Sequence, residues 1–305
     1  MKTNREQQQF NSNPASSIEK AIRDYIANNP NNRFLAFPEE AIWDSPVVGF
    51  ANGNDPIFQE YKTIIGDFHL TPREVLETYI DTTVRGDKSK LAHISVISFA
   101  LPATLKTRES NRRENKICSV RWNHTRFEGQ EVVARLSRHL VTLIEDMGHM
   151  AVAPELARWF EPVQSPSGLS SKWSQRHAAY AAGLGTFGLS DGFITPVGIA
   201  IRIGSVVCDL EIPPTPRKYA NHRANCLFYS RGTCRKCAER CPAGAITEKG
   251  HDKNKCFAYL QEMRKIAQQE DKTEGYIGKA YLGCGFCQTG VPCEDKIPVE
   301  VGSNK

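Results

Sequence analysis

Hydrophobic residues in the first part of the chain recur at helical spacing. Apolar positions lie three or four residues apart between positions 18 and 26, after a capping box that begins at Ser16, and this pattern predicts a helix over residues 17–28. A second capping box runs from Thr71 to Glu74 and has Pro72 at the first helical position. It predicts a helix that ends near Thr83.

The middle of the chain alternates between extended and helical patterns. The segment Ile94–Leu101 is β-branched and almost entirely apolar, which predicts a strand buried on both faces. An amphipathic pattern predicts a long helix from about Gly129 to Met147, followed by a short strand over His149–Val152. A strand, a long helix and another strand together predict a crossover unit and an α/β core.

A glycine-rich loop follows the next predicted helix, which covers residues 172–182. The loop, residues 183–188, superficially matches a dinucleotide-binding fingerprint, but it follows a helix instead of a strand, which argues against a Rossmann site. An alternating pattern then predicts a strand over Ile199–Cys208. Prolines at 213, 214 and 216 mark a linker, so we expect one domain over residues 1–215 and a second over 216–305.

Eight of the ten cysteines lie in the second predicted domain, with C-x2-C spacing and a proline after the fourth of them. A C-x2-C-x3-C-P run gives closely spaced thiolates to one [4Fe-4S] cluster and its last cysteine to another. We therefore expect two clusters. The first would be bound by Cys226, Cys234, Cys237 and Cys293, and the second by Cys241, Cys256, Cys284 and Cys287.

Two other uses of these cysteines are chemically possible. A disulfide framework belongs to short secreted chains, whereas the polar run MKTNREQQQF at positions 1–10 has no apolar segment that could act as a signal peptide. Two zinc sites with four thiolates each are the stronger rival, because zinc also favours C-x2-C pairs. The proline after Cys241 and the wide spacing to Cys256 favour iron.

The composition and charge of the chain indicate where the protein is located and which partners it could bind. The chain has 305 residues and a net charge of +5, and no apolar stretch approaches the roughly 18 residues of a membrane span, so we expect a cytoplasmic protein with no membrane partner. Much of the positive charge lies between Lys106 and Arg126. This segment indicates either a polyanion-binding patch, such as one for RNA, or a solvated loop or the rim of an anionic cofactor pocket.

Three sets of motifs carry a family resemblance. They are the loop AAGLGTFG at 181–188, the strand RIGSVVCD at 202–209, and the cysteine run with its PAGAI, CFAYL and GCGFCQ segments. In this order they resemble the epoxyqueuosine reductase and reductive dehalogenase superfamily of cobalamin-dependent iron–sulfur enzymes. The resemblance covers about residues 90–295 and is most specific in the C-terminal third.

The resemblance implies an α/β (α+β) fold. A nitroreductase-like domain would bind cobalamin without a histidine ligand below the cobalt, and a small ferredoxin-like domain with two [4Fe-4S] clusters would follow it. Cofactor-binding positions would be Ser171, Gly183, Gly185, Gly188 and Arg202. Arg202 is included because a buried guanidinium needs an anionic or carbonyl partner; the alternative is an arginine that faces solvent on an edge strand.

The sequence departs from the family at the proton donor. Epoxyqueuosine reductases carry a catalytic aspartate about fourteen residues before the AGLG loop, where this chain has Leu169 and no nearby acid. We therefore expect His177 or Tyr180 to supply the proton, since both side chains can act as general acids. Ser170 or Ser171 would occupy the place of the missing acid.

About two hundred residues before the clusters favour a reductase over a simple carrier. The expected activity is reduction of a small organic or nucleoside-like substrate through cobalamin, with ferredoxin or flavodoxin as the electron donor. One alternative is an electron-transfer or corrinoid-reducing protein without substrate chemistry. Another is an epoxyqueuosine reductase acting on tRNA, a partner that the missing aspartate makes less favoured.

Overall fold

The centre of the fold is an antiparallel sheet with the strand order β1-β2-β8-β3. Its strands are β1 (Val47–Asn52), β2 (Ser95–Pro102), β3 (Ala151–Val152) and β8 (Ile201–Cys208). The computed structural model describes residues 12–84, 87–165, 168–270, 274–277 and 283–298. Every residue of β2 is buried, which confirms the prediction of a strand covered on both faces.

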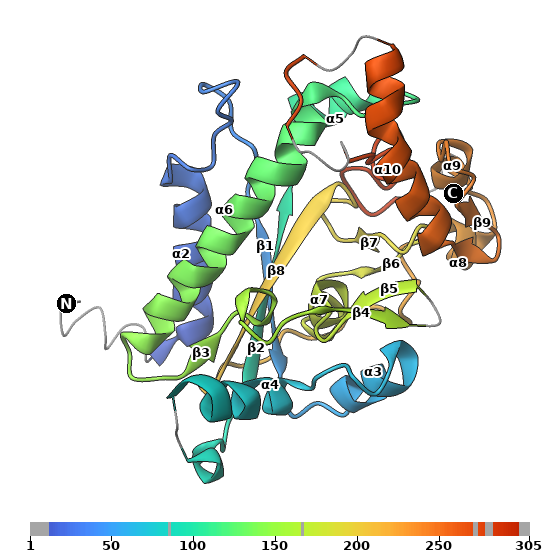
Figure 1. Ribbon diagram of the computed structural model, residues 1–305. Helices are drawn as coiled ribbons and strands as arrows, with labels where there is room; N and C mark the ends of the chain where they lie inside the picture. Colours follow the sequence, from blue (N-terminus) through green and yellow to red (C-terminus); the bar gives the residue numbers. More distant parts are fainter. Residues whose placement is uncertain (1–11, 85–86, 166–167, 271–273, 278–282, 299–305) are drawn as a thin grey trace, which may run out of the picture.

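Helices cover both faces of this sheet (Figure 1). They are α2 (Pro14–Asn28), α3 (Ile57–Ile65), α4 (Pro72–Tyr79), α5 (Leu105–Arg112), α6 (Val120–Glu145) and α7 (Gln175–Ala181). Alternate residues of β2 divide between two hydrophobic cores: Ile97 and Phe99 pack with α2 and α6, whereas Val96 packs with α3, α4 and α7. This layered arrangement confirms the expected α/β fold.

The crossover unit is confirmed, with one strand inserted. Both β2 and β3 pair antiparallel with β8, so β2 and β3 run parallel to each other with β8 between them and α6 connecting them. In the sequence β8 follows both β2 and β3, but in the sheet it lies between them.

The long helix α6 begins nine residues before the predicted start at Gly129. Ser119 caps it, its side chain accepting a hydrogen bond from the backbone of Trp122. Gly129 lies inside the helix, at a position where a Cβ would stand 2.5 Å from the Trp43 ring. The glycine allows a close approach between helix and ring, and does not mark a helix end.

The remaining elements are short and lie toward the C-terminal part. They are the hairpins β4 (Pro162–Ser165) with β5 (Gly168–Ser171), β6 (Thr186–Phe187) with β7 (Phe193–Ile194) and β9 (Ile246–Thr247) with β10 (Gly250–His251), and the helices α8 (Leu227–Arg231), α9 (Lys236–Glu239) and α10 (Lys253–Gln269). A π-helical turn, Ile80–Val84, extends α4. Short 3-10 turns cover Lys88–Lys90 and Pro154–Leu156.

The C-terminal part packs closely against the α/β part. Met263 and Ala267 of α10 are fully buried in the same hydrophobic core as α2 and α6. The proline-rich segment expected to be a linker is also fixed, because Thr215 exchanges hydrogen bonds with Phe50 on the edge of β1. The domain boundary near residue 215 stays a prediction. Within the described ranges, no helix has the length and apolar character needed to cross a bilayer.

Candidate functional site

The eight cysteines of the C-terminal part come from helix ends and loops. Cys226 is the N-cap residue of α8, Cys237 lies in α9 and Cys256 lies in the first turn of α10. The others follow or precede these helices in loops: Cys234, Cys241, Cys284, Cys287 and Cys293. None of the eight is paired in a disulfide.

The first predicted group of cysteines is brought together. Burial raises the pKa of the Cys237 thiol to about 12, and Cys226 and Cys234 raise it further as electrostatic neighbours. Burial also raises the pKa of Cys293, whose strongest thiol neighbours are Cys237, Cys226 and Cys234. The four sulfurs assigned to the first cluster therefore surround one another.

The second predicted group is brought together as well. Burial raises the pKa of Cys284 to about 12, with Cys256 and Cys241 among its neighbours. Burial raises that of Cys287, whose neighbours are Cys284, Cys256, Cys237 and Cys241. The structure also brings Cys118 close to Cys284, a contact that the sequence spacing did not indicate.

The chemistry of these donors fits iron–sulfur clusters. Burial makes each thiolate costly by itself, and bound iron offsets that cost by holding the sulfur in its deprotonated form. Among the described residues, no three His, Cys, Asp or Glu side chains are placed to share a single metal ion. In a cubane each thiolate binds its own iron, so its four ligands are spread more widely than those of one ion.

The ligand loops are fixed by the α/β part. The Asn111 side chain of α5 donates hydrogen bonds to the carbonyl of Cys284, at 3.1 Å, and to the hydroxyl of Thr289, at 3.0 Å. The backbone N–H of Ile199 donates to the carbonyl of Cys293 at 2.8 Å. Gly285 packs so tightly on Trp122 that a Cβ would stand 2.0 Å from the indole.

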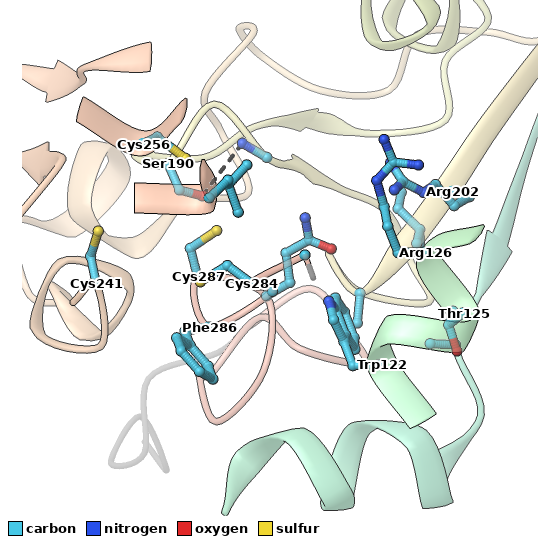
Figure 2. A pocket seen from close by; sticks show the side chains of 18 of the residues that line it. Trp122, Thr125, Arg126, Ser190, Arg202, Cys241, Cys256, Cys284, Phe286 and Cys287 are labelled. Atoms are coloured by element: carbon cyan, nitrogen blue, oxygen red, sulfur yellow. Dashed lines mark hydrogen bonds between the residues drawn. The ribbon is translucent and has the colours of Figure 1, made fainter. Parts of the chain in front are cut away.

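A cavity of about 290 Å³ lies beside the second group of cysteines. Figure 2 shows Cys256, Cys284 and Cys287 on one side of it, with Arg126 and Arg202 on the opposite side. Arg202, predicted to bind a cofactor, is half-buried on β8 and lines this cavity. Two guanidinium groups in the same cavity as these cysteines would offset part of the negative charge of a cluster.

A second cavity, of about 580 Å³, contains most of the other predicted site residues. Ser171, His177, Tyr180 and Gly188 all line it. Its rim includes apolar side chains that face solvent, with Ile64 67 % exposed and Leu169 52 % exposed. Exposed apolar side chains around a concave site are typical of a ligand-binding cleft.

The position of the missing family aspartate reaches this second cavity. Leu169, found by counting back from the AGLG loop, lies on β5 and lines the cavity next to Ser170. The position at which the motif spacing would place the acid therefore lines the cavity with an apolar side chain. Residues 166 and 167 of the same segment lie outside the described residues.

His177 and Tyr180 differ in their suitability as proton donors. Burial lowers the pKa of His177 to about 3, so its ring is neutral at pH 7. The Ser174 hydroxyl lies 2.8 Å from its Nδ1. A neutral imidazole is a much weaker acid than an imidazolium, which makes Tyr180 the better candidate.

Gly183 and Gly185 are placed away from both cavities, unlike Gly188. A Cβ at Gly185 would stand 2.2 Å from the carbonyl oxygen of Ile194. Gly183 has a φ of 72°, and a Cβ there would stand 2.8 Å from the carbonyl oxygen of Pro216. These two glycines allow the loop to pack against the backbone, which is a structural reason for the AGLG motif.

The two cavities meet at a wall that the sequence did not indicate. Arg176 lines both of them, and its guanidinium binds the carbonyl oxygen of Asp191. Asp191 lines the second cavity, and His251 lines the first. The only sequence signal here was the Ser-Asp-Gly turn at 190–192.

The basic segment is largely neutralised by the chain itself. Arg112 contacts Glu294 at 2.7 Å, Lys116 contacts Glu270 at 2.8 Å, and Arg121 pairs with Glu40. Its charges are thus used mainly to attach neighbouring segments, and they give little support to an RNA-binding patch.

Comparison with known proteins agrees with this geometry. Residues 232–293, which include seven of the eight cysteines, match the 4Fe-4S double cluster binding domain family. An epoxyqueuosine reductase of Bacillus anthracis is 24 % identical over 205 residues, which are 65 % of this chain and 47 % of that protein. The chain thus spans about half the length of this curated relative.

Two solved structures can be superposed on much of the chain. A selenomethionine-labelled epoxyqueuosine reductase has a TM-score of 0.46 at 16 % identity, covering 92 % of this chain and 66 % of that one. A catabolic reductive dehalogenase variant has a TM-score of 0.47 at 15 % identity, covering 97 % of this chain and 39 % of that one.

The cysteine groups, the matched domain and the α/β part define the class: an iron–sulfur protein with a double-cluster domain attached to a layered α/β domain. The curated relatives and the ordered motifs go further. Over about two thirds of its length the chain is similar to curated epoxyqueuosine reductases, in agreement with the resemblance that the sequence motifs indicated.

Proposed function

We propose that the chain is an oxidoreductase in which two [4Fe-4S] clusters pass electrons to a cobalamin, and from there to a small organic or nucleoside-like substrate in the second cavity. The observation that carries the proposal is the position of the second cysteine group. It lines the first cavity, and that cavity is separated from the second by a single wall containing Arg176.

The lining of the second cavity fits a corrinoid in its chemistry. Apolar side chains, among them Ile64 and Leu169, suit the face of a large macrocycle. The hydroxyls of Ser170, Ser171 and Ser174 suit its peripheral amides. The cavity is open to solvent at its apolar rim, so a ligand larger than its volume can extend beyond it. When bound, cobalamin supplies a reduced metal centre that delivers electrons to the substrate.

Side chains of the protein would supply the proton for the reaction and the positive charge that binds an anionic group. Tyr180 lines the cavity beside Phe187, with the ring centroids 6.1 Å apart, and is the proposed proton donor. Arg202 lies on the cluster side of the wall and would hold an anionic or carbonyl group. Ferredoxin or flavodoxin is the proposed electron donor.

The first test is anaerobic purification and reconstitution with added cobalamin. We expect about eight irons per polypeptide and corrin absorption bands that remain after gel filtration. A Tyr180→Phe variant should retain both cofactors and lose turnover. Protein that contains zinc instead of iron would refute the proposal, and iron-loaded protein that never retains a corrinoid would refute its cobalamin part.

A second candidate is an electron-transfer or corrinoid-reducing protein without substrate chemistry. Leu169 favours it, because an apolar side chain occupies the place of the acid that protonates the substrate in epoxyqueuosine reductases. Such a protein would accept and pass on electrons with unchanged kinetics in Tyr180→Phe. Restoration of queuosine in a strain lacking its reductase would instead identify tRNA as the substrate.

A further inference from the structure

Asp191 has a strained backbone at the wall between the two cavities. Its φ is 57°, and it is the one residue other than glycine with positive φ in the described part of the chain. Such a conformation costs roughly 1–3 kcal/mol and persists only where surrounding contacts hold it. Here the guanidinium of Arg176 binds its carbonyl oxygen.

The Asp191 carboxylate is directed to His251. Oδ2 lies 3.4 Å from Nδ1 of the imidazole, a charge-assisted contact that lacks the geometry of a linear hydrogen bond. Burial raises the pKa of Asp191, but its contact with His251 and the charges of Arg176 and Lys253 lower it by more. The carboxylate is therefore ionised and held in place.

The His251 ring also lies near a predicted cluster ligand, Cys256. The Cys256 sulfur interacts with the ring, both residues line the first cavity, and the His251 side chain is only 16 % exposed. This contact follows from the local fold, because β10 ends at His251, Asp252 caps α10, and Cys256 lies in the first turn of that helix. An iron-bound thiolate carries no proton, so the ring must be the donor.

From this arrangement we propose that His251 is a positioning residue for the second cluster. Held by Asp191, its ring donates a hydrogen bond to the Cys256 sulfur and so sets the reduction potential of that cluster. The inference rests on the proposed function in one respect, the presence of a cluster on Cys256. It links the cluster to the second cavity, because Asp191 forms part of the lining of that cavity.

The physical basis is the charge of the reduced cluster. Reduction adds an electron that spreads partly onto the ligand sulfurs, and a hydrogen-bond donor at a sulfur stabilises this more negative state. Loss of the donor should therefore lower the reduction potential. The effect should be confined to the cluster bound by Cys256.

The test is a redox titration of anaerobically reconstituted protein, followed by EPR. His251→Phe keeps a ring of similar size and removes both N–H groups, so one of the two midpoint potentials should fall. His251→Gln keeps an N–H donor and should give a potential between those of His251→Phe and the wild type. If His251→Phe fails to assemble its second cluster, the reduction potential of His251→Gln still tests the role of the ring.

A matched control exists just before β3, at the edge of the central sheet. His149 makes a similar contact with Asp209, at 3.2 Å, away from every cysteine predicted to bind a cluster. His149→Phe should leave both potentials unchanged. If both variants bind all their iron and keep the wild-type potentials, the inference about His251 is wrong, while the proposed function still stands. The same holds if both clusters shift equally. Wild-type protein without iron would overturn the proposed function too.

Discussion

At the scale of single residues, the two groups of thiols are distinguished by their neighbours. Cys293 interacts with the other three members of its group, although it lies 56 residues beyond Cys237 in the chain. Cys287 interacts chiefly with members of the second group and also with Cys237. The two groups of cysteines are therefore neighbours, as electron transfer between two clusters requires.

Paired substitutions test this partition. Cys226→Ser and Cys293→Ser should each remove about four of eight irons, and the double variant should lose no more, because both residues belong to one cluster. Combining Cys293→Ser with Cys287→Ser should remove almost all iron. Cys208→Ala is the control, since Cys208 is buried on β8 away from both groups. Additive iron loss in the first double variant would contradict the partition.

A buried histidine makes stability depend on pH. His69 is 1 % exposed, and burial lowers its pKa to about 4, whereas an unfolded histidine titrates near 6.5. Below about pH 6.5 this histidine binds a proton in the unfolded chain, whereas in the folded chain its ring stays neutral down to about pH 4. The free energy of unfolding should fall as the pH falls from about 6.5 toward 4, by up to about 3 kcal/mol from this group.

Urea denaturation of wild type and His69→Gln at pH 5 to 7.5 would measure this effect. The variant should show a smaller dependence on pH, because one titrating group is removed. His93 provides the control: its side chain is 56 % exposed, and His93→Gln should keep the wild-type slope. Identical slopes for His69→Gln and wild type would contradict the burial argument.

At the scale of elements, the cluster loops depend on close backbone approaches. Gly198 has a φ of 84°, and a Cβ there would stand 2.2 Å from the carbonyl oxygen of Glu294, next to Cys293. Gly148, after α6, has a φ of 85° and no atom within 4 Å of its Cβ position. The two glycines share a backbone conformation but differ in their surroundings.

Alanine substitutions separate the cost of the left-handed backbone from the cost of the close contact with Glu294. Gly148→Ala should cost only the left-handed backbone penalty, roughly 1–2 kcal/mol. Gly198→Ala should cost clearly more and reduce the iron content of the cluster that includes Cys293. Thermal unfolding and iron analysis of both variants would decide. Equal losses of stability, with full iron in both, would show that the loop can move aside.

At the scale of the whole molecule, buried ion pairs attach the cluster loops to α5. The Glu294 side chain is 4 % exposed and lies 2.7 Å from Arg112 and 3.5 Å from Arg108. It also accepts a hydrogen bond from the backbone of Gly290. Since α10 shares the main hydrophobic core, we expect the two parts of the chain to unfold together.

Removing one partner of this network should be strongly destabilising. Glu294→Gln removes the buried carboxylate that Arg108 and Arg112 share, leaving Asp295 at 3.9 Å from Arg108, and should cost about 3–5 kcal/mol. Glu248→Gln removes an exposed pair with Arg235, whose side chains are 60 % and 56 % exposed, and should cost less than about 1 kcal/mol. Denaturant unfolding followed by tryptophan fluorescence measures both. Similar small losses would show that the core alone joins the two parts.

The sequence by itself predicted several of the elements and the cysteine pattern of a double-cluster domain. Local rules were sufficient for the capping box at Thr71, the buried strand β2 and the cysteine spacing, because each depends on residues close together in the chain. Only the tertiary structure decided the strand order, the start of α6 beyond Gly129, and the separation of Arg202 from His177 into different cavities. It alone brought Asp191, His251 and Cys256 together, because contacts between distant segments leave no periodic trace in a single sequence.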